Sequence, residues 1–204
     1  MRELTRKQTQ AATKRKLLDA GSRELARVGA HELSIRALTA AAGLTAGAFY
    51  SNFRSRDEYL SELCSSVIED FLASIRKTLD RACRGTIEQA IEANALWARN
   101  VDERIACAML EFGMLAHSDE KFRKNYMPMA SAFQEQLAAL LRAFFETFRL
   151  RPQMSYEQMA SGFMTMWMGQ LMFRYMPDHE RFRSAIALFL SELIRASSPV
   201  EKQP

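Results

Sequence analysis

The sequence has little glycine and proline, and no run of residues is long and apolar enough for a membrane. Its 204 residues include 8 Gly and 5 Pro, whereas Ala, Leu, Met, Arg and Glu are frequent. These frequent residues favour helices, and few helix breakers separate them. The longest charge-free runs have seventeen and sixteen residues, 37–53 and 158–173, and both are short of the ~20 apolar residues of a membrane span. We expect an all-α protein with no membrane partner.

Catalytic and metal-binding motifs are also missing. The sequence has no HExxH, no Gly-rich phosphate loop, no Ser elbow and no CxxC, and its three cysteines lie far apart. A metal site at His117, Asp119 and Glu120 and a redox role for the cysteines stay open as alternatives. The polar start MRELTRKQTQ precedes no apolar segment, so we expect no secretory signal. These absences predict a cytoplasmic protein that is not an enzyme and has no cofactor.

Positive charge is concentrated at the N-terminal end. Residues 1–60 contain 11 Lys and Arg against 6 Asp and Glu, whereas residues 61–204 contain 17 against 18. This asymmetry favours a polyanion as the partner of the first third of the chain. Part of the excess comes from a basic arm, which either is a solvated face or contacts phosphates. Its members are Arg2, Arg6, Lys7, Lys14, Arg15 and Lys16.

The first third predicts three helices separated by short turns. Apolar residues at helical spacing predict a helix over about 9–28 that ends at Gly29. Ser34 has the character of an N-cap, and the helix that it opens stops at Gly43, which suits a left-handed C-terminus. Thr45 then caps a third helix. Two short helices joined by a tight Gly-containing turn form a helix-turn-helix unit.

The remaining sequence predicts six further helices. The fourth opens at Ser55, where Ser-Arg-Asp-Glu is typical of a capping box, and continues to about Asp80. The other five are expected near 86–99, 102–117, 119–148, 154–175 and 178–197. The tail from Ser197 onward is expected to be disordered.

The third helix carries unusually small residues in its first turn. Ala46, Gly47 and Ala48 would let the backbone approach base edges in the major groove of DNA. On the preceding helix, Arg36 is the long side chain placed to read a guanine edge. The alternative is a solvated surface turn over two core phenylalanines, but capping, spacing and charge together favour DNA binding.

The run SIRALTAAAGLTAGAFYSNFRSRDEYL, residues 34–60, resembles the DNA-binding signature of the tetracycline-repressor (TetR) family of bacterial transcriptional regulators. The similarity extends over roughly residues 11–62, with Gly21 and Thr39 standing where Ala is usual. It implies phosphate contacts at Ser34, Thr45, Tyr50, Asn52 and Arg56. It implies base contacts at Arg36, Ala46, Gly47 and Ala48.

The last two predicted helices are apolar over more than one stripe, so both sides of each helix need covering. The helices could both be central in a monomer, but pairing with a second copy in a four-helix interface is the favoured interpretation. The predicted interface residues are Met168, Met172, Phe182, Ile186, Phe189 and Leu193.

A set of apolar and aromatic residues predicts an effector pocket, chiefly because the resemblance implies one. Such residues are more often core, but the 12 methionines suit an adaptable apolar cavity. Glu111 could add a polar anchor or could face solvent. The predicted pocket residues are Trp97, Met109, Phe112, Met129, Phe133, Phe163 and Trp167.

These observations predict an all-α protein of about nine helices with two domains. Residues 1–54 would form a three-helix helix-turn-helix DNA-binding domain, and residues 55–204 a helical dimerisation and ligand-binding domain. The expected protein is a homodimeric repressor that binds a palindromic operator in double-stranded DNA and is released by a small hydrophobic effector. The alternatives are an activator, a co-repressor-dependent regulator, or a helical ligand-binding or enzymatic protein with a vestigial helix-turn-helix.

Overall fold

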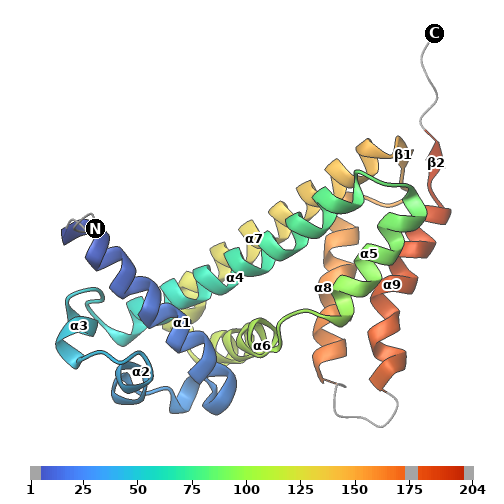
Figure 1. The fold of residues 1–204 in the computed structure, drawn as a ribbon. Helices are drawn as coiled ribbons and strands as arrows, with labels where there is room; N and C mark the ends of the chain where they lie inside the picture. Colours follow the sequence, from blue (N-terminus) through green and yellow to red (C-terminus); the bar gives the residue numbers. More distant parts are fainter. Residues whose placement is uncertain (1–5, 173–178, 200–204) are drawn as a thin grey trace. The chain divides into compact units, whose positions relative to one another are not determined.

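The computed structural model describes residues 6–172 and 179–199, and these residues are almost entirely helical (Figure 1). The elements are α1 (Arg6–Glu32), α2 (Ile35–Ala41), α3 (Ala46–Tyr50), α4 (Arg56–Ala82), α5 (Ile87–Arg99), α6 (Glu103–Ser118), α7 (Glu120–Thr147), β1 (Leu150–Arg151), α8 (Tyr156–Met172), α9 (His179–Arg195) and β2 (Ser198–Pro199). The prediction of an all-α fold with about nine helices is confirmed within the described ranges. None of the helices described is both long and apolar enough to cross a membrane.

Local hydrogen bonds fix the helix-turn-helix as its sequence predicts. The Ser34 hydroxyl accepts from the Ala37 N–H at 3.1 Å, and the Thr45 hydroxyl accepts from the Ala48 N–H at 3.2 Å. Each bond satisfies a donor that a helix N-terminus would otherwise leave unpaired. Gly43 has φ 64°, in the left-handed region that glycine adopts without steric cost.

Two helix ends add detail to their predictions. The regular helix of α1 is interrupted at Gly29, where its end was predicted: the chain kinks there, with φ 77° and ψ 169°, and a short helical stretch continues to Glu32. At the start of α4, the Ser55 hydroxyl accepts from the Glu58 N–H as expected. The Glu58 carboxylate, however, accepts from the N–H of Arg54 at 2.6 Å, one residue before the expected partner.

The chain divides into two compact units. The first comprises residues 1–70 and 102–129, and the second comprises residues 71–101 and 130–204. Helices α4 and α7 contribute residues to both. The predicted boundary between residues 54 and 55 separates functions rather than packing units, and it stays a prediction.

In the first unit, α1 packs against α6 and against the two helices of the helix-turn-helix. Its core contains Phe49, Phe53 and Tyr59, whose ring centroids lie 5.0–5.4 Å apart. The Tyr59 hydroxyl donates to the Leu17 carbonyl at 3.0 Å. A Cβ atom at Gly21 would lie 1.7 Å from that hydroxyl oxygen, so the glycine makes room for the buried tyrosine.

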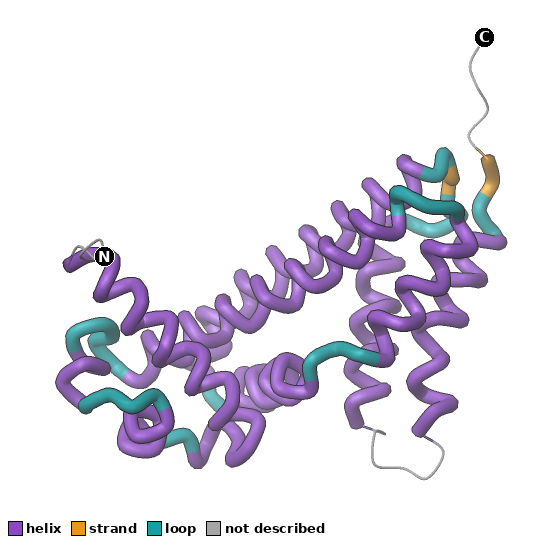
Figure 2. The backbone as a smooth tube through the Cα atoms, viewed as in Figure 1, coloured by secondary structure: helices purple, strands orange, loops and turns teal. Residues whose placement is uncertain are grey.

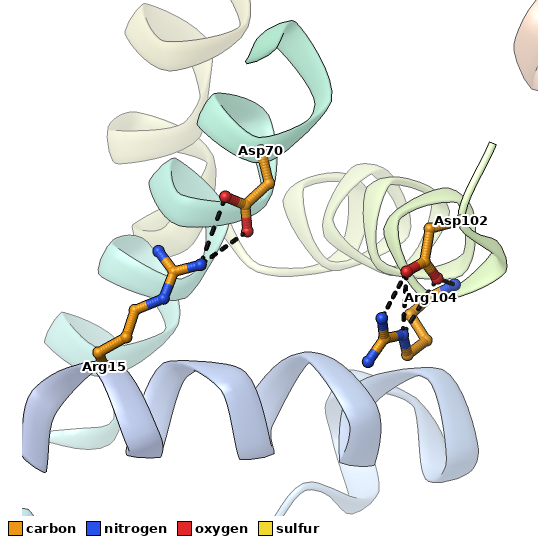
Figure 3. A network of polar contacts seen from close by, with 4 residues as sticks. All are labelled: Arg15, Asp70, Asp102 and Arg104. Atoms are coloured by element: carbon orange, nitrogen blue, oxygen red, sulfur yellow. Dashed lines mark hydrogen bonds and ion pairs between the residues drawn. The ribbon is translucent and has the colours of Figure 1, made fainter. Parts of the chain in front are cut away.

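Ion pairs in the first unit lie both between helices and at the start of a single helix. Arg15 of α1 reaches Asp70 of α4, with N···O distances of 3.4 and 3.5 Å (Figure 3). At the start of α6, Arg104 pairs with Asp102 in the same view. The hydrogen bonds from Arg104 lower the pKa of Asp102 and keep that carboxylate charged. All these groups remain partly exposed, so each pair contributes little to stability.

The second unit is built around aromatic side chains. Helices α5 and α8 pack on α9, and Phe71 of α4 is fully buried beneath them. Its ring lies 5.7 Å from Trp97, 5.7 Å from Phe133 and 4.5 Å from Trp167.

A short β-ladder joins two ends of this unit (Figure 2). Strand β1 follows α7, and β2 follows α9. They pair antiparallel, with Leu150 opposite Pro199 and Arg151 opposite Ser198. The tail is therefore ordered at least to Pro199, contrary to the sequence-based expectation of disorder from Ser197 onward. Its order comes from backbone pairing with β1, which the side chains of the tail do not indicate. Residues 200–204 lie outside the described part.

Candidate nucleic-acid interface and effector cavity

The first turn of α3 presents a bare backbone to solvent. Ala46 and Gly47 are exposed, and Ala48 is half-buried. A Cβ atom at Gly47 would have only the Thr45 hydroxyl oxygen within 4 Å, at 3.7 Å. Beneath this surface, Phe49 is fully buried and fixes the helix on the core. The helix can therefore approach a flat or grooved partner closely without disturbing its own packing.

Polar groups surround this turn. The Ser34 and Thr45 hydroxyls accept the capping bonds and keep their own protons for a phosphate oxygen. Tyr50 is 59 % exposed, and its ring is held edge-on by Phe49 at 5.3 Å. The Asn52 amide nitrogen instead donates to the Ala48 carbonyl at 2.8 Å, so this predicted phosphate donor supports α3 from within.

Three arginines near the helix-turn-helix have different surroundings. Arg36 on α2 and Arg54 before α4 are exposed, and neither side chain bonds to a described residue. The Arg56 guanidinium is half-buried and donates to the carbonyls of Ala30 at 2.6 Å and Leu33 at 3.3 Å. Arg54, which the sequence argument did not select, is therefore freer to reach a phosphate than Arg56 is.

The basic arm has mixed roles. Lys14 pairs with Glu62 at 2.7 Å, and Arg15 pairs with Asp19 at 3.0 Å as well as with Asp70. Lys7 and Lys16 are exposed and make no ion pair with a described residue. Arg2 and the side chain of Arg6 lie outside the described residues. Some of the N-terminal positive charge thus joins α1 to α4 and is already partly neutralised.

The second unit encloses a small apolar cavity of about 30 Å³. Side chains from α4, α5, α7, α8 and α9 line it, and Asn94 is the polar one among them. The Asn94 amide nitrogen donates to the Ala90 carbonyl at 2.8 Å, which orients the side chain. Sequence reasoning missed Asn94, because nothing in its own helix indicates that this amide is buried.

The seven predicted pocket residues divide between the two units. Trp97 and Phe163 line the cavity with stacked rings 5.7 Å apart. Phe133 and Trp167 are buried in the same unit, against Phe71. The other three, Met109, Phe112 and Met129, belong to the first unit.

The first-unit members have partners of their own. Phe112 is fully buried and stacks on Phe122 at 5.9 Å, and the Met129 sulfur accepts from the Ser65 hydroxyl at 3.0 Å. Glu111 was expected either to anchor the pocket or to face solvent. It lies in the first unit, away from the cavity lining, and its carboxylate accepts a hydrogen bond from the Ala30 N–H at 2.7 Å.

The predicted interface residues differ in exposure. Met172 is 68 % exposed, and its neighbour in the predicted set, Met168, is half-buried. Phe189 and Leu193 are half-buried, whereas Ile186 is already fully covered by its own chain. The side chain of Phe182 lies outside those described. Leu188, which the sequence argument omitted, is 60 % exposed on α9.

The alternative chemical sites find little local support. Within the described ranges, no group of three or more His, Cys, Asp and Glu side chains could hold a metal ion. Asp119 instead accepts from the Phe122 N–H at 2.9 Å and caps α7. Burial raises the pKa of the Cys64 thiol to about 12, which makes it a poor nucleophile at neutral pH.

The comparisons with known proteins agree with this geometry. The family model described as "Bacterial regulatory proteins, tetR family" matches residues 17–63. A solved structure from Rhodococcus sp., assigned to the TetR family, is 15 % identical with a TM-score of 0.72 and covers 90 % of this chain and 99 % of its own. E. coli NemR in its reduced form is 14 % identical, with a TM-score of 0.71 and coverages of 91 % and 99 %. Salmonella enterica GusR is 16 % identical, with a TM-score of 0.63 and coverages of 90 % and 96 %. No curated protein sequence matches the chain significantly.

The fold and the exposed, capped α3 define an all-α chain with an N-terminal helix-turn-helix unit. Residues 17–63 match the model of the TetR family of bacterial regulatory proteins, and the solved structures show that the chain shares the fold of TetR-family proteins. The family resemblance predicted from residues 34–60 is thereby confirmed.

Proposed function

We propose that this protein is a cytoplasmic transcriptional repressor. In this proposal it binds a palindromic operator as a homodimer, with α3 in the major groove, and a small hydrophobic effector releases it. The observation that carries the proposal is the first turn of α3. Small, exposed residues lie on a helix whose N-cap is satisfied, with an exposed tyrosine on the same helix and an exposed arginine on α2.

Each group would have a role that follows from its chemistry. Ala46 and Ala48 suit contact with thymine methyl groups, and Gly47 lets the backbone approach the bases. Arg36 suits a bidentate contact with a guanine edge. Ser34, Thr45 and Tyr50 can donate hydroxyl protons to phosphates, and Arg54 can add a charged contact that carries no sequence information.

Exposed apolar surface on the last two helices supports the homodimer. Met172 and Leu188 are more than half exposed, and large side chains of this kind are costly to leave in water. Because a two-fold dimer presents two copies of α3, the preferred operator would be palindromic, with half-sites about one helical turn of DNA apart.

The cavity in the second unit supports an apolar effector. Its lining has no charged side chain, so a charged ligand would lose its hydration without compensation. Its volume of about 30 Å³ holds only a few atoms, so a larger effector must displace lining side chains. Such a displacement would give the effector different affinities for two conformations, which release from DNA requires.

The test is selection of duplexes from a randomised library by the purified protein. We expect the selection to recover one palindromic sequence. The protein should then shift the mobility of that duplex and of DNA from upstream of its own gene. Recovery of no preferred sequence would show that the helix-turn-helix does not read DNA.

The dimer is tested separately by Leu188→Asp, with Leu96→Asp as the control. The two leucines are 60 % and 63 % exposed, so neither substitution buries a charge within the chain. Light scattering should report monomers for Leu188→Asp, because an aspartate would be desolvated at the proposed interface, and dimers for Leu96→Asp. A dimer that persists in Leu188→Asp would move the interface away from this face of α9.

A further inference from the structure

The backbone of Ala30 is held on both sides by side chains from helices distant in sequence. Its N–H donates to the Glu111 carboxylate of α6 at 2.7 Å. Its carbonyl accepts from the Arg56 guanidinium of α4 at 2.6 Å. All three residues belong to the first unit.

Gly29 creates the geometry that this clamp needs. Its φ of 77° and ψ of 169° fall in a region that is essentially restricted to glycine. A Cβ atom at Gly29 would lie 3.0 Å from one Glu111 carboxylate oxygen and 3.4 Å from the other. The carboxylate therefore rests against the bare Cα of the kink and accepts the N–H that follows it.

The clamp lies at the entrance to the helix-turn-helix. Arg56 also donates to the carbonyl of Leu33, the residue directly before the N-cap Ser34. The bonds from α6 and α4 therefore fix the chain on both sides of residues 31–32, immediately before α2. Because α2 packs against α3, the position of this entrance determines where the recognition helix lies.

We propose that Glu111 is a positioning residue for DNA recognition: through the Ala30 N–H it holds α2 and α3 at the angle that matches successive base edges. The inference rests on the proposed DNA-binding function. A helix end can be closed by groups next to it in sequence, as Gly43 does for α2. The Glu111 bond spans 81 residues of sequence instead, and it ties the end of α1 to one turn of α6.

A positioning role and simple electrostatic repulsion predict opposite changes in operator affinity when Glu111 is replaced. An acidic side chain on a DNA-binding unit repels phosphates, so its removal should strengthen binding to every duplex alike. A positioning role predicts the opposite for the operator alone, because a displaced α3 loses base contacts while non-specific phosphate contacts persist.

The test uses Glu111→Asp, which keeps the charge and shortens the side chain by one methylene. The matched control is Glu69→Asp, because Glu69 is exposed on α4 in the same unit. Fluorescence anisotropy measures affinity for the duplex selected by the wild type and for a scrambled duplex of equal length, at one salt concentration. We expect Glu111→Asp to bind the selected duplex about 10-fold more weakly, as loss of a partly buried charged hydrogen bond implies. Its affinity for the scrambled duplex should be unchanged.

Glu111→Gln supplies the rescue, since its amide oxygen can still accept the Ala30 N–H. It should restore the wild-type ratio of the two affinities. The positioning role would be overturned if Glu111→Asp left the ratio of the affinities for the selected and scrambled duplexes unchanged, whether or not its thermal stability fell. It would also be overturned if Glu69→Asp lost as much affinity for the selected duplex as Glu111→Asp does. If the wild type selects no duplex, the proposed function fails, and this outcome is distinct from the others.

Discussion

The helix-turn-helix and the aromatic core of the second unit are held by opposite kinds of contact. In the helix-turn-helix, the bonds that fix α2 and α3 join residues three apart, as between Thr45 and Ala48. In the second unit, Phe71 meets Trp97, Phe133 and Trp167, which lie on three other helices. The caps and the turn of the first region are specified by its own short sequence, whereas the packing of the second depends on several helices distant in sequence.

This difference matches the tasks proposed for the two regions. A surface that presses on DNA needs a fixed backbone with small, exposed side chains, and local caps provide it without bulky packing. A cavity that accepts an apolar molecule needs side chains from several helices that can separate, and Asn94, Trp97 and Phe163 come from two of those helices. Substitutions in the two regions should therefore differ in size and in what they affect.

The largest effect is expected in the aromatic core. Phe71→Ala should lower the free energy of unfolding by about 3–5 kcal/mol, because it removes a fully buried ring and leaves a cavity among three aromatic neighbours. The control is Leu96→Ala at a side chain that is 63 % exposed, which should change stability by no more than about 0.5 kcal/mol. Urea denaturation measures both, and similar values for the two variants would contradict a core centred on Phe71.

A smaller loss is expected where α1 meets α4. Gly21→Ala should cost about 1–3 kcal/mol, because the new Cβ atom would overlap the Tyr59 hydroxyl. In a Tyr59→Phe background the same change should cost less, since the overlapping oxygen is gone. A double-mutant cycle by denaturation gives the coupling energy, and strictly additive costs would show that Gly21 does not accommodate the tyrosine.

A loss of about 1 kcal/mol is expected for the local cap. Thr45→Ala removes the acceptor of the Ala48 N–H, whereas Thr45→Ser keeps it. The matched control is Thr165→Ala, in the middle of α8, where the hydroxyl donates to the Ser161 carbonyl one turn earlier and caps nothing. If thermal unfolding shows equal effects for Thr45→Ala and Thr165→Ala, the N-cap contributes nothing specific.

What could be predicted from the sequence follows the same division. The caps Ser34 and Thr45 and the turn at Gly43 were predictable because each depends on neighbours within four residues. The contrasting surroundings of Arg54 and Arg56 were not, since the carbonyls that hold Arg56 belong to Ala30 and Leu33, more than twenty residues away.

The cavity shows the same limit more strongly. The resemblance and their aromatic character made Trp97 and Phe163 candidates, but Phe112 was chosen on the same grounds, although it packs in the first unit. A pattern along one helix indicates which side chains are covered and not which helix covers them. Asn94 was missed for the complementary reason, because burial of its amide depends on side chains from four other helices.

We propose that the exposed first turn of α3 is the surface that reads DNA, and Gly47→Glu is the sharpest test of this proposal. The fold has room for this side chain, and glutamate favours a helix more than glycine does, so stability should not fall. Ala73→Glu, at an exposed position of α4 in the second unit, is the control for added negative charge. We predict that Gly47→Glu binds the selected duplex at least about 100-fold more weakly, through steric exclusion and like-charge repulsion, while Ala73→Glu stays close to the wild type. Wild-type affinity in a folded Gly47→Glu protein would contradict the claim.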